Sequence, residues 1–304
     1  MTPTAGGGRE PVDQAWLEAV CRKTDEILWR SHAFALAADR PTDDPAASAH
    51  EWPSVMFPVK GKERRIGEHE ARLAFVAALL RDPASQEWAL AAEAPTKLSY
   101  RFASRGAGTK SQRALNDLAL YRRIAEPQTD GEAHPDAGVQ RVVEPYGAAD
   151  ARRDTEVPTL TVAFKAGGRS GKSESDESLK KAAATLIAEQ PAALWFHVVH
   201  NANGATLQGL LRALGAAFAT LSNPFRLAHY VAAGKTPQPV TKRIAFHICV
   251  LNPDVRLSIH RVLAFKPGKL EKDFFAIDTQ ETPATAARPA PLTVARDQGW
   301  SVHS

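Results

Sequence analysis

The stretch PTLTVAFKA, residues 158–166, decides how the chain is expected to fold. Successive side chains of an extended strand point to opposite faces. Leu160 and Phe164 therefore share an apolar face, whereas Ala163 and Lys165 share the other face. A glycine-rich segment follows at once. A lysine on such a strand either reaches solvent at the strand end or has a chemical role, and this segment alone leaves both open.

The residues around this strand predict a mixed α/β protein with a central sheet flanked by helices. Apolar periodicities of two residues indicate strands, and periodicities near 3.6 indicate helices. Short turn signals such as Asn-Pro-Asp separate them. The expected order is a helix over 65–81, strands over 86–103, 114–122 and 158–166, a helix over 177–190, a strand over 192–200, a helix over 205–221, and strands over 242–251 and 256–265.

Composition shifts divide the chain into three parts. Residues 1–58 are expected to form a helix over 13–37 followed by a linker rich in Pro, Ala and Asp. Residues 59–270 form the main domain, with a polar insertion at about 124–157. Residues 271–304 are rich in Pro, Ala and Thr, and we expect a loosely packed tail there.

The composition excludes several classes of protein. Apolar residues make up 44% and charged residues 24% of the 304 residues, which is typical of globular proteins. No apolar run approaches the roughly 18 residues of a transmembrane helix, and the first residues do not resemble a signal peptide. Two cysteines, Cys21 and Cys249, are too few for a disulfide framework or a thiolate zinc site. A soluble cytoplasmic protein without a membrane partner is predicted.

Basic residues concentrate in one part of the sequence. The whole chain has a net charge of +4, which by itself does not indicate a nucleic-acid partner. Between Lys97 and Arg123, however, seven basic residues accompany a single acid, Asp117, so this segment carries +6. The segment is either a solvated face or a surface that follows a phosphate backbone.

Asp117 lies between apolar residues in RALNDLALYRR, where an acid needs a partner or a role. One reading is a turn or an ion-pair aspartate, supported by the preceding Asn116. The functional reading pairs Asp117 with Lys165 from a neighbouring strand. The carboxylate would then bind Mg²⁺, and the lysine would position water and offset the charge of a phosphate.

These residues resemble the PD-(D/E)XK nuclease superfamily, which has the restriction-endonuclease-like fold. Asn116-Asp117 is similar to the first half of the motif, and Ala163-Phe164-Lys165 matches the second half in frame. Members of the family have an αβββαβ core and often a glutamate on its first helix. Glu68 suits that place better than Glu70. The resemblance covers roughly residues 65–221 and implies a catalytic site of Asp117, Ala163, Lys165 and Glu68, with Mg²⁺ or Mn²⁺ held by Glu68 and Asp117.

Ala163 departs from the motif because the family has a metal-binding acid there. Without this acid the chain is expected to cut poorly or not at all. Either the alanine is an inactivating substitution in a nuclease, or the chain is a natural pseudo-enzyme that keeps a binding surface. The retained Asp117, Lys165 and Glu68 favour the first explanation.

The expected partner is DNA, and a further protein subunit or a second copy of the chain is compatible with the insertion and the N-terminal helix. Phosphate contacts would give salt-dependent affinity without sequence information. The residues expected to make them are Lys97, Arg101, Arg105, Lys110, Arg113, Arg169 and Lys172.

Two other patterns were weighed. AGGRSGKS, residues 166–173, fits a permissive P-loop, but the acidic SESDES that follows Lys172 disfavours a nucleotide. The histidines, His247 and His260 among them, are expected to be structural, and His197 is expected to lie nearest the Lys165 strand. The sequence thus predicts a metal-dependent DNA nuclease whose activity is impaired by Ala163. A role as the effector of a restriction or antiphage system is what the family resemblance implies. The alternative is a non-catalytic nucleic-acid-binding or assembly subunit.

Overall fold

A computed structural model gives the structure of most of the chain. The insertion at 124–157 lies outside the described residues, as do Arg105, Arg169 and Lys172. The described residues are 12–38, 53–60, 63–64, 67–103, 109–122, 158–167, 176–189, 192–231, 241–253, 255–271, 273–281, 292–295 and 298–304.

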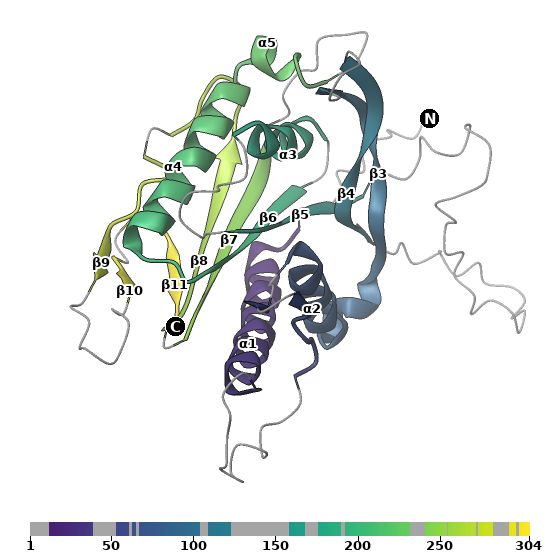
Figure 1. Ribbon diagram of the computed structural model, residues 1–304. Helices are drawn as coiled ribbons and strands as arrows, with labels where there is room; N and C mark the ends of the chain where they lie inside the picture. Colours follow the sequence, from purple (N-terminus) through teal and green to yellow (C-terminus); the bar gives the residue numbers. More distant parts are fainter. Residues whose placement is uncertain are drawn as a thin grey trace, which may run out of the picture.

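A parallel trio of strands forms the centre of the molecule (Figure 1). Strand β6 (Ala192–His200) pairs in parallel with β5 (Leu160–Ala166) on one side and with β7 (Lys242–Asn252) on the other. The sequence AALWFHVVH suits this place, because a strand covered on both faces reads as a nearly continuous apolar run. Seven of its nine residues are buried.

Antiparallel strands extend the sheet on both sides to seven strands in the order β11-β8-β7-β6-β5-β4-β3. Strand β4 (Thr109–Arg122) joins β5 to the edge strand β3 (Trp88–Ala103), and β8 (Val255–Phe265) joins β7 to β11 (Ser301–His303). Two small ladders stand apart from this sheet, made by β1 (Val59–Lys60) with β2 (Glu63–Arg64) and by β9 (Thr279–Glu281) with β10 (Leu292–Val294).

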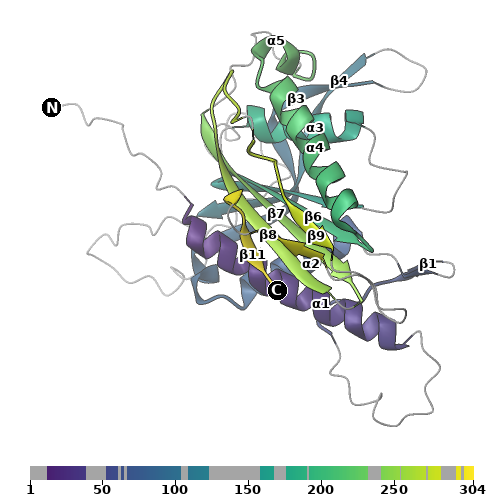
Figure 2. The ribbon, with the colours of Figure 1, turned by 90° about the vertical axis from the view of Figure 1, so that its left-hand side faces the viewer.

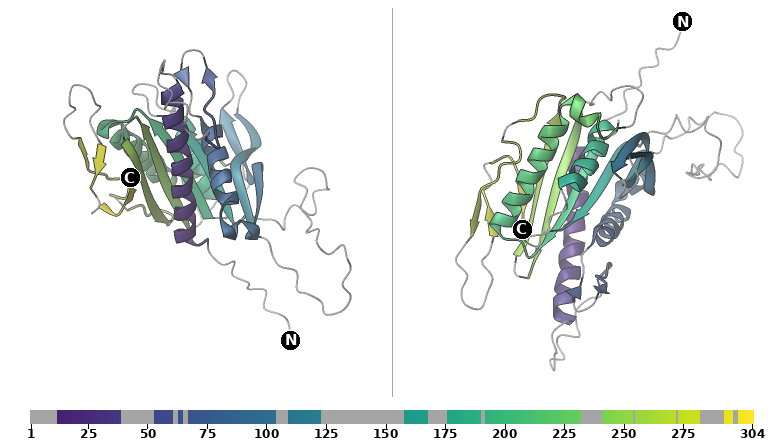
Figure 3. Two further views of the ribbon diagram at one scale, coloured as in Figure 1. Left: turned by 90° about the horizontal axis from the view of Figure 1, so that it is seen from below. Right: turned by 45° about the horizontal axis from the view of Figure 1, so that its top comes forward.

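Helices cover both faces of the sheet (Figures 2 and 3). Helices α3 (Asp176–Ala188) and α4 (Gly204–Leu221) connect the parallel strands and pack on one face. Helices α1 (Gln14–Ala38) and α2 (Glu68–Leu80) pack on the other face. The short helix α5 (Pro224–Leu227) follows α4, and the 3-10 turn η2 (Pro83–Glu87) precedes β3.

Each face has its own apolar cluster, because alternate residues of the central strands point to opposite sides. On the α3/α4 side, Phe218 makes edge-to-face contacts with Trp195 and Phe246. On the α1/α2 side, Phe75 of α2 makes them with Phe164 and Phe196. The sheet therefore fixes how the four large helices lie relative to one another.

The mixed α/β class and the order of elements confirm the prediction from the sequence. The terminal parts contribute to the same structure. Helix α1 shares the apolar cluster of α2, and β11 belongs to the main sheet. Trp300 is 3% exposed, so the expectation of a loosely packed tail is wrong for the described residues near the C-terminus. No described helix is long and apolar enough to cross a membrane.

Replacement of Phe218 by alanine should lower the free energy of unfolding by about 3–5 kcal/mol, because it leaves a cavity in a closely packed cluster. Phe225→Ala is the matched control, since Phe225 is 79% exposed and its removal should change the value by less than about 0.5 kcal/mol. Urea denaturation of both variants measures this. Equal losses would contradict the placement of the α4 side chains.

Candidate active site at Asp117

Asp117 lies where β4 loses regular pairing with both of its neighbours. On the β3 side, the described pairs include Ala92 with Leu118 and Ala94 with Asn116, but Glu93 and Asp117, which face each other between them, form no described pair. Glu93 has φ +53°, a left-handed conformation that non-glycine residues rarely adopt. On the β5 side the described ladder runs from Leu120 only as far as Leu118.

The Asp117 side chain takes over the hydrogen bond that the ladder would otherwise make. Its Oδ2 atom accepts the backbone N–H of Phe164 at 2.7 Å. Asp117 is half-buried, so this bond fixes a charged group at the gap between β4 and β5. The predicted meeting of Asp117 with the Ala163-Phe164-Lys165 strand is therefore a direct contact.

Lys165 extends from the end of β5 to the beginning of α2. Its Nζ atom lies 3.1 Å from Oε1 of Glu68, and the side chains are 13% and 40% exposed respectively. Glu68 is the first residue of α2, where the helix dipole favours a negative charge. Glu70 instead caps the helix, because its Oε2 accepts the N–H of Gly67 at 2.7 Å. Of the two acids, Glu68 is thus the one whose carboxylate lies against Lys165, whereas Glu70 is used within its own helix.

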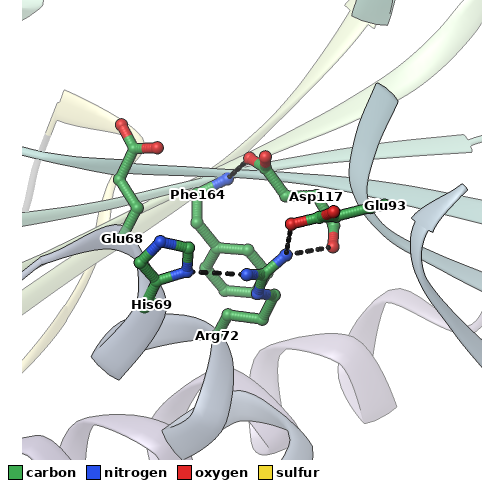
Figure 4. Close-up of a pocket in the computed structure, with 6 residues that line it drawn as sticks. All are labelled: Glu68, His69, Arg72, Glu93, Asp117 and Phe164. Carbon is green, nitrogen blue, oxygen red and sulfur yellow. Dashed lines mark hydrogen bonds and ion pairs between the residues drawn. The ribbon is translucent and has the colours of Figure 1, made fainter. Parts of the chain in front are cut away.

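A small pocket connects Glu68 with Asp117 (Figure 4). The guanidinium of Arg72 lies within it and donates to the carbonyl oxygen of Asp117 at 3.1 Å. It also lies 3.6 Å from the Glu93 carboxylate and 2.7 Å from Nδ1 of His69. Arg72 therefore holds α2 against β3 and β4 at the point where these strands lose their regular pairing.

Three of the pocket residues, Arg72, His69 and Glu93, were not predicted from the sequence. Arg72 follows Glu68 by four positions and so shares its helix face, which is a signal that spacing alone could have provided. Glu93 carries no such signal, because its place depends on its unusual backbone conformation.

Ala163 is not among the residues that line this pocket. It packs against the apolar cluster beneath α3 and α4, opposite Trp195 in the β5–β6 register. The next register position on that face pairs Lys165 with His197, as expected from neighbouring strands. Burial and the nearby Lys165 lower the pKa of His197 to about 3, so the imidazole is neutral at physiological pH. Trp195 Nε1 lies 3.4 Å from its Nδ1.

The residues present do not complete a magnesium site. Glu68 and Asp117 offer the carboxylate oxygens that Mg²⁺ prefers. Ala163 offers none, and among the described residues Glu68 and Asp117 do not belong to a group of three ligand-bearing side chains whose ligand atoms all lie within 4.8 Å of one another. Glu68 and Asp117, the predicted metal ligands, thus line the same pocket but do not by themselves form a complete set of ligands for Mg²⁺.

The basic residues of the β3–β4 hairpin are partly described. Arg101 and Arg113 are exposed, and their register positions place them on the same face. Four residues of extended strand, about 13 Å, separate Arg113 from Asp117. Lys97 and Lys110 belong to the same strands, but their side chains lie outside the described set. This part of the predicted DNA-binding surface therefore adjoins the pocket.

Comparison with known proteins adds no family. The chain matches no family model, and searches of curated proteins and of solved structures found no match.

His197 should make the protein sensitive to acid. Its pKa is about 3 in the folded chain and near 6.5 when unfolded, so the unfolded state binds more protons between these values. This contribution to stability is complete above pH 6.5 and is lost as the pH falls toward 3. Relative to His197→Gln, the wild-type chain should lose about 1.4 kcal/mol per pH unit within this window. Urea unfolding at a series of pH values measures the difference. Parallel curves would contradict the assignment.

Proposed function

We propose that the chain is a DNA-directed nuclease domain of the PD-(D/E)XK type whose metal site is incomplete at Ala163. The observation that carries this proposal is the meeting of Asp117, Lys165 and Glu68 where β4 and β5 part. The order α2, β3, β4, β5, α3, β6 also agrees with the αβββαβ core of that family.

The roles of the side chains follow from their contacts. Asp117 is fixed by the Phe164 amide, and Glu68 by the Lys165 ammonium, so both carboxylates are held before any ligand arrives. A bound Mg²⁺ or Mn²⁺ would supply Lewis-acid chemistry for phosphodiester hydrolysis. With two carboxylates and Ala163, we expect weak metal binding and slow or absent cutting. The lysine would then mainly attract a phosphate.

Exposed arginines beside the pocket support DNA as the substrate. Arg101 and Arg113 lie on one face of a long hairpin, a spacing that suits successive contacts to a phosphate backbone. A cytoplasmic location and a place in a restriction or antiphage system belong to the same proposal and rest on the resemblance and composition alone.

A second candidate is a non-catalytic nucleic-acid-binding or assembly subunit. The specific observation in its favour is that Ala163 packs against an apolar cluster and offers no ligand atom. Glu68 and Asp117 are then the two candidate metal ligands that remain. The nucleotide-binding alternative depends on Lys172, which lies outside the described residues, and it stays a prediction from the sequence.

Restoring the acid tests the first candidate. Ala163→Glu should produce Mg²⁺-dependent cutting of linear or supercoiled DNA at least about tenfold faster than the given chain, because the new carboxylate would lie on the same face of β5 as Lys165 and add a third acid to Glu68 and Asp117. Ala163→Gln is the matched control, with nearly the same volume and no charge. Cutting is followed on gels with Mg²⁺ and with chelator.

If Ala163→Glu folds and binds DNA but both variants stay inactive, the nuclease proposal fails and the binding-subunit candidate replaces it. Circular dichroism and urea unfolding establish that the variant is folded, since a carboxylate beside the apolar cluster is costly.

Removal of the two hairpin arginines tests the DNA surface. The double variant Arg101→Ala, Arg113→Ala should weaken DNA binding and reduce the slope of log affinity against log salt by about 2, because two phosphate contacts are lost. Arg212→Ala with Arg256→Ala removes the same charge from exposed positions on α4 and β8. Fluorescence anisotropy measures both. Equal slopes for the two double variants would count against the hairpin surface.

A further inference from the structure

A second group of ligand-bearing side chains lies buried between α1 and the strands β7 and β8. Cys21 comes from α1, His247 from β7 and His260 from β8, and one ligand atom of each lies within 4.8 Å of the others. Their side chains are almost completely excluded from solvent, with residue exposures of 0%, 0% and 2%. Three ligand-bearing groups from three elements thus meet in the interior, beside the apolar cluster of the α1/α2 side.

The two imidazoles have a spacing that suits a shared metal ion. His247 and His260 are register partners across the β7–β8 ladder, and their Nδ1 atoms lie 3.3 Å apart. Two nitrogens bound to one Zn²⁺ at about 2.05 Å and a tetrahedral angle are separated by about 3.3 Å. Without an ion, one of these nitrogens has to donate a hydrogen bond to the other.

The neighbouring carboxylate is placed as an orienting group. Both oxygens of Asp25 lie 2.9 Å from Nε2 of His247, so this nitrogen carries the proton and leaves Nδ1 as a lone pair toward His260. A carboxylate on the far nitrogen of a histidine is a common companion of zinc ligands. Asp25 and Cys21 are four positions apart and share one face of α1.

The second ring nitrogen of His260, Nε2, is a further polar atom of this buried group. This atom is buried and has no hydrogen-bond partner within the described part of the chain. A buried polar atom without a partner is costly, so the His260 ring is an unusual group for this interior.

We propose that Cys21, His247 and His260 bind a zinc ion. One thiolate and two imidazoles favour Zn²⁺ over Mg²⁺, which prefers oxygen ligands. The fourth position would be taken by water. The ion would link α1 to β7 and β8 and so stabilise the fold. It would take no part in the chemistry of the Asp117 pocket. The proposal is independent of the nuclease assignment.

Metal analysis of the full-length protein tests this directly. Purified in zinc-containing medium without chelator, the chain should carry one zinc per molecule by mass spectrometric metal analysis. After zinc removal, Co²⁺ should bind in equal ratio and give the intense d–d bands of tetrahedral cobalt with a thiolate charge-transfer band. A folded wild-type chain that holds no zinc and takes up no cobalt overturns the proposal.

Two cysteine variants locate the site. Cys21→Ser should abolish the thiolate charge-transfer band and weaken cobalt binding by at least about tenfold, whereas Cys249→Ser should keep a thiolate band. Asp117→Asn should leave zinc content unchanged, which separates this site from the nuclease pocket. A charge-transfer band that survives in Cys21→Ser, or that is lost only in Cys249→Ser, would overturn the assignment of Cys21.

Discussion

Burial of β6 on both faces is the constraint on which the architecture depends. Parallel neighbours cannot be reached by tight turns, so the chain has to cross over through α3 and α4, and these helices cover one side of the sheet. The other side still presents Leu194, Phe196 and Val198, and it is covered by α1 and α2. Both candidate sites follow from this arrangement. The Asp117 pocket lies where α2 begins against the sheet, and the Cys21 group lies where α1 crosses β7 and β8.

The two sites differ in how their polar side chains are stabilised next to an apolar core. At Asp117 the strands separate, and a carboxylate replaces a backbone acceptor while Lys165 balances Glu68. This pocket is open to solvent, since Glu68 and Glu93 are both partly exposed. At Cys21 the ladder between β7 and β8 is unbroken, and the imidazoles of His247 and His260 face each other in a closed interior. Such a closed place suits a small ion with a structural role.

Much of the architecture could be predicted from the sequence, because periodicity and turn residues determine which segments are strands and helices. Asn203, for example, precedes the apolar run of α4 as capping residues do, and its Oδ1 accepts the N–H of Thr206 at 2.8 Å. The short motif around Lys165 located Asp117 and Glu68 as well. Arg72 and Glu93 were not predicted because their contacts depend on the left-handed backbone conformation of Glu93, which no local sequence pattern indicates. His247 and His260 were each interpreted as separate structural residues. The sequence does not show that they are register partners, nor that Cys21, 226 positions before His247, lies beside them.

The irregular course of β3 has a consequence for self-association. This strand forms an outer edge of the sheet, and an uninterrupted edge of sixteen residues would be a template for another chain. Glu93 interrupts it with its left-handed backbone, and Pro95 begins a shift in register that lasts to Ser99. Beyond that, the Arg101 N–H is already bonded to the carbonyl of Tyr230 at 2.7 Å. The distortion that shapes the pocket therefore also divides the edge into shorter segments, which makes it a poorer template for another chain.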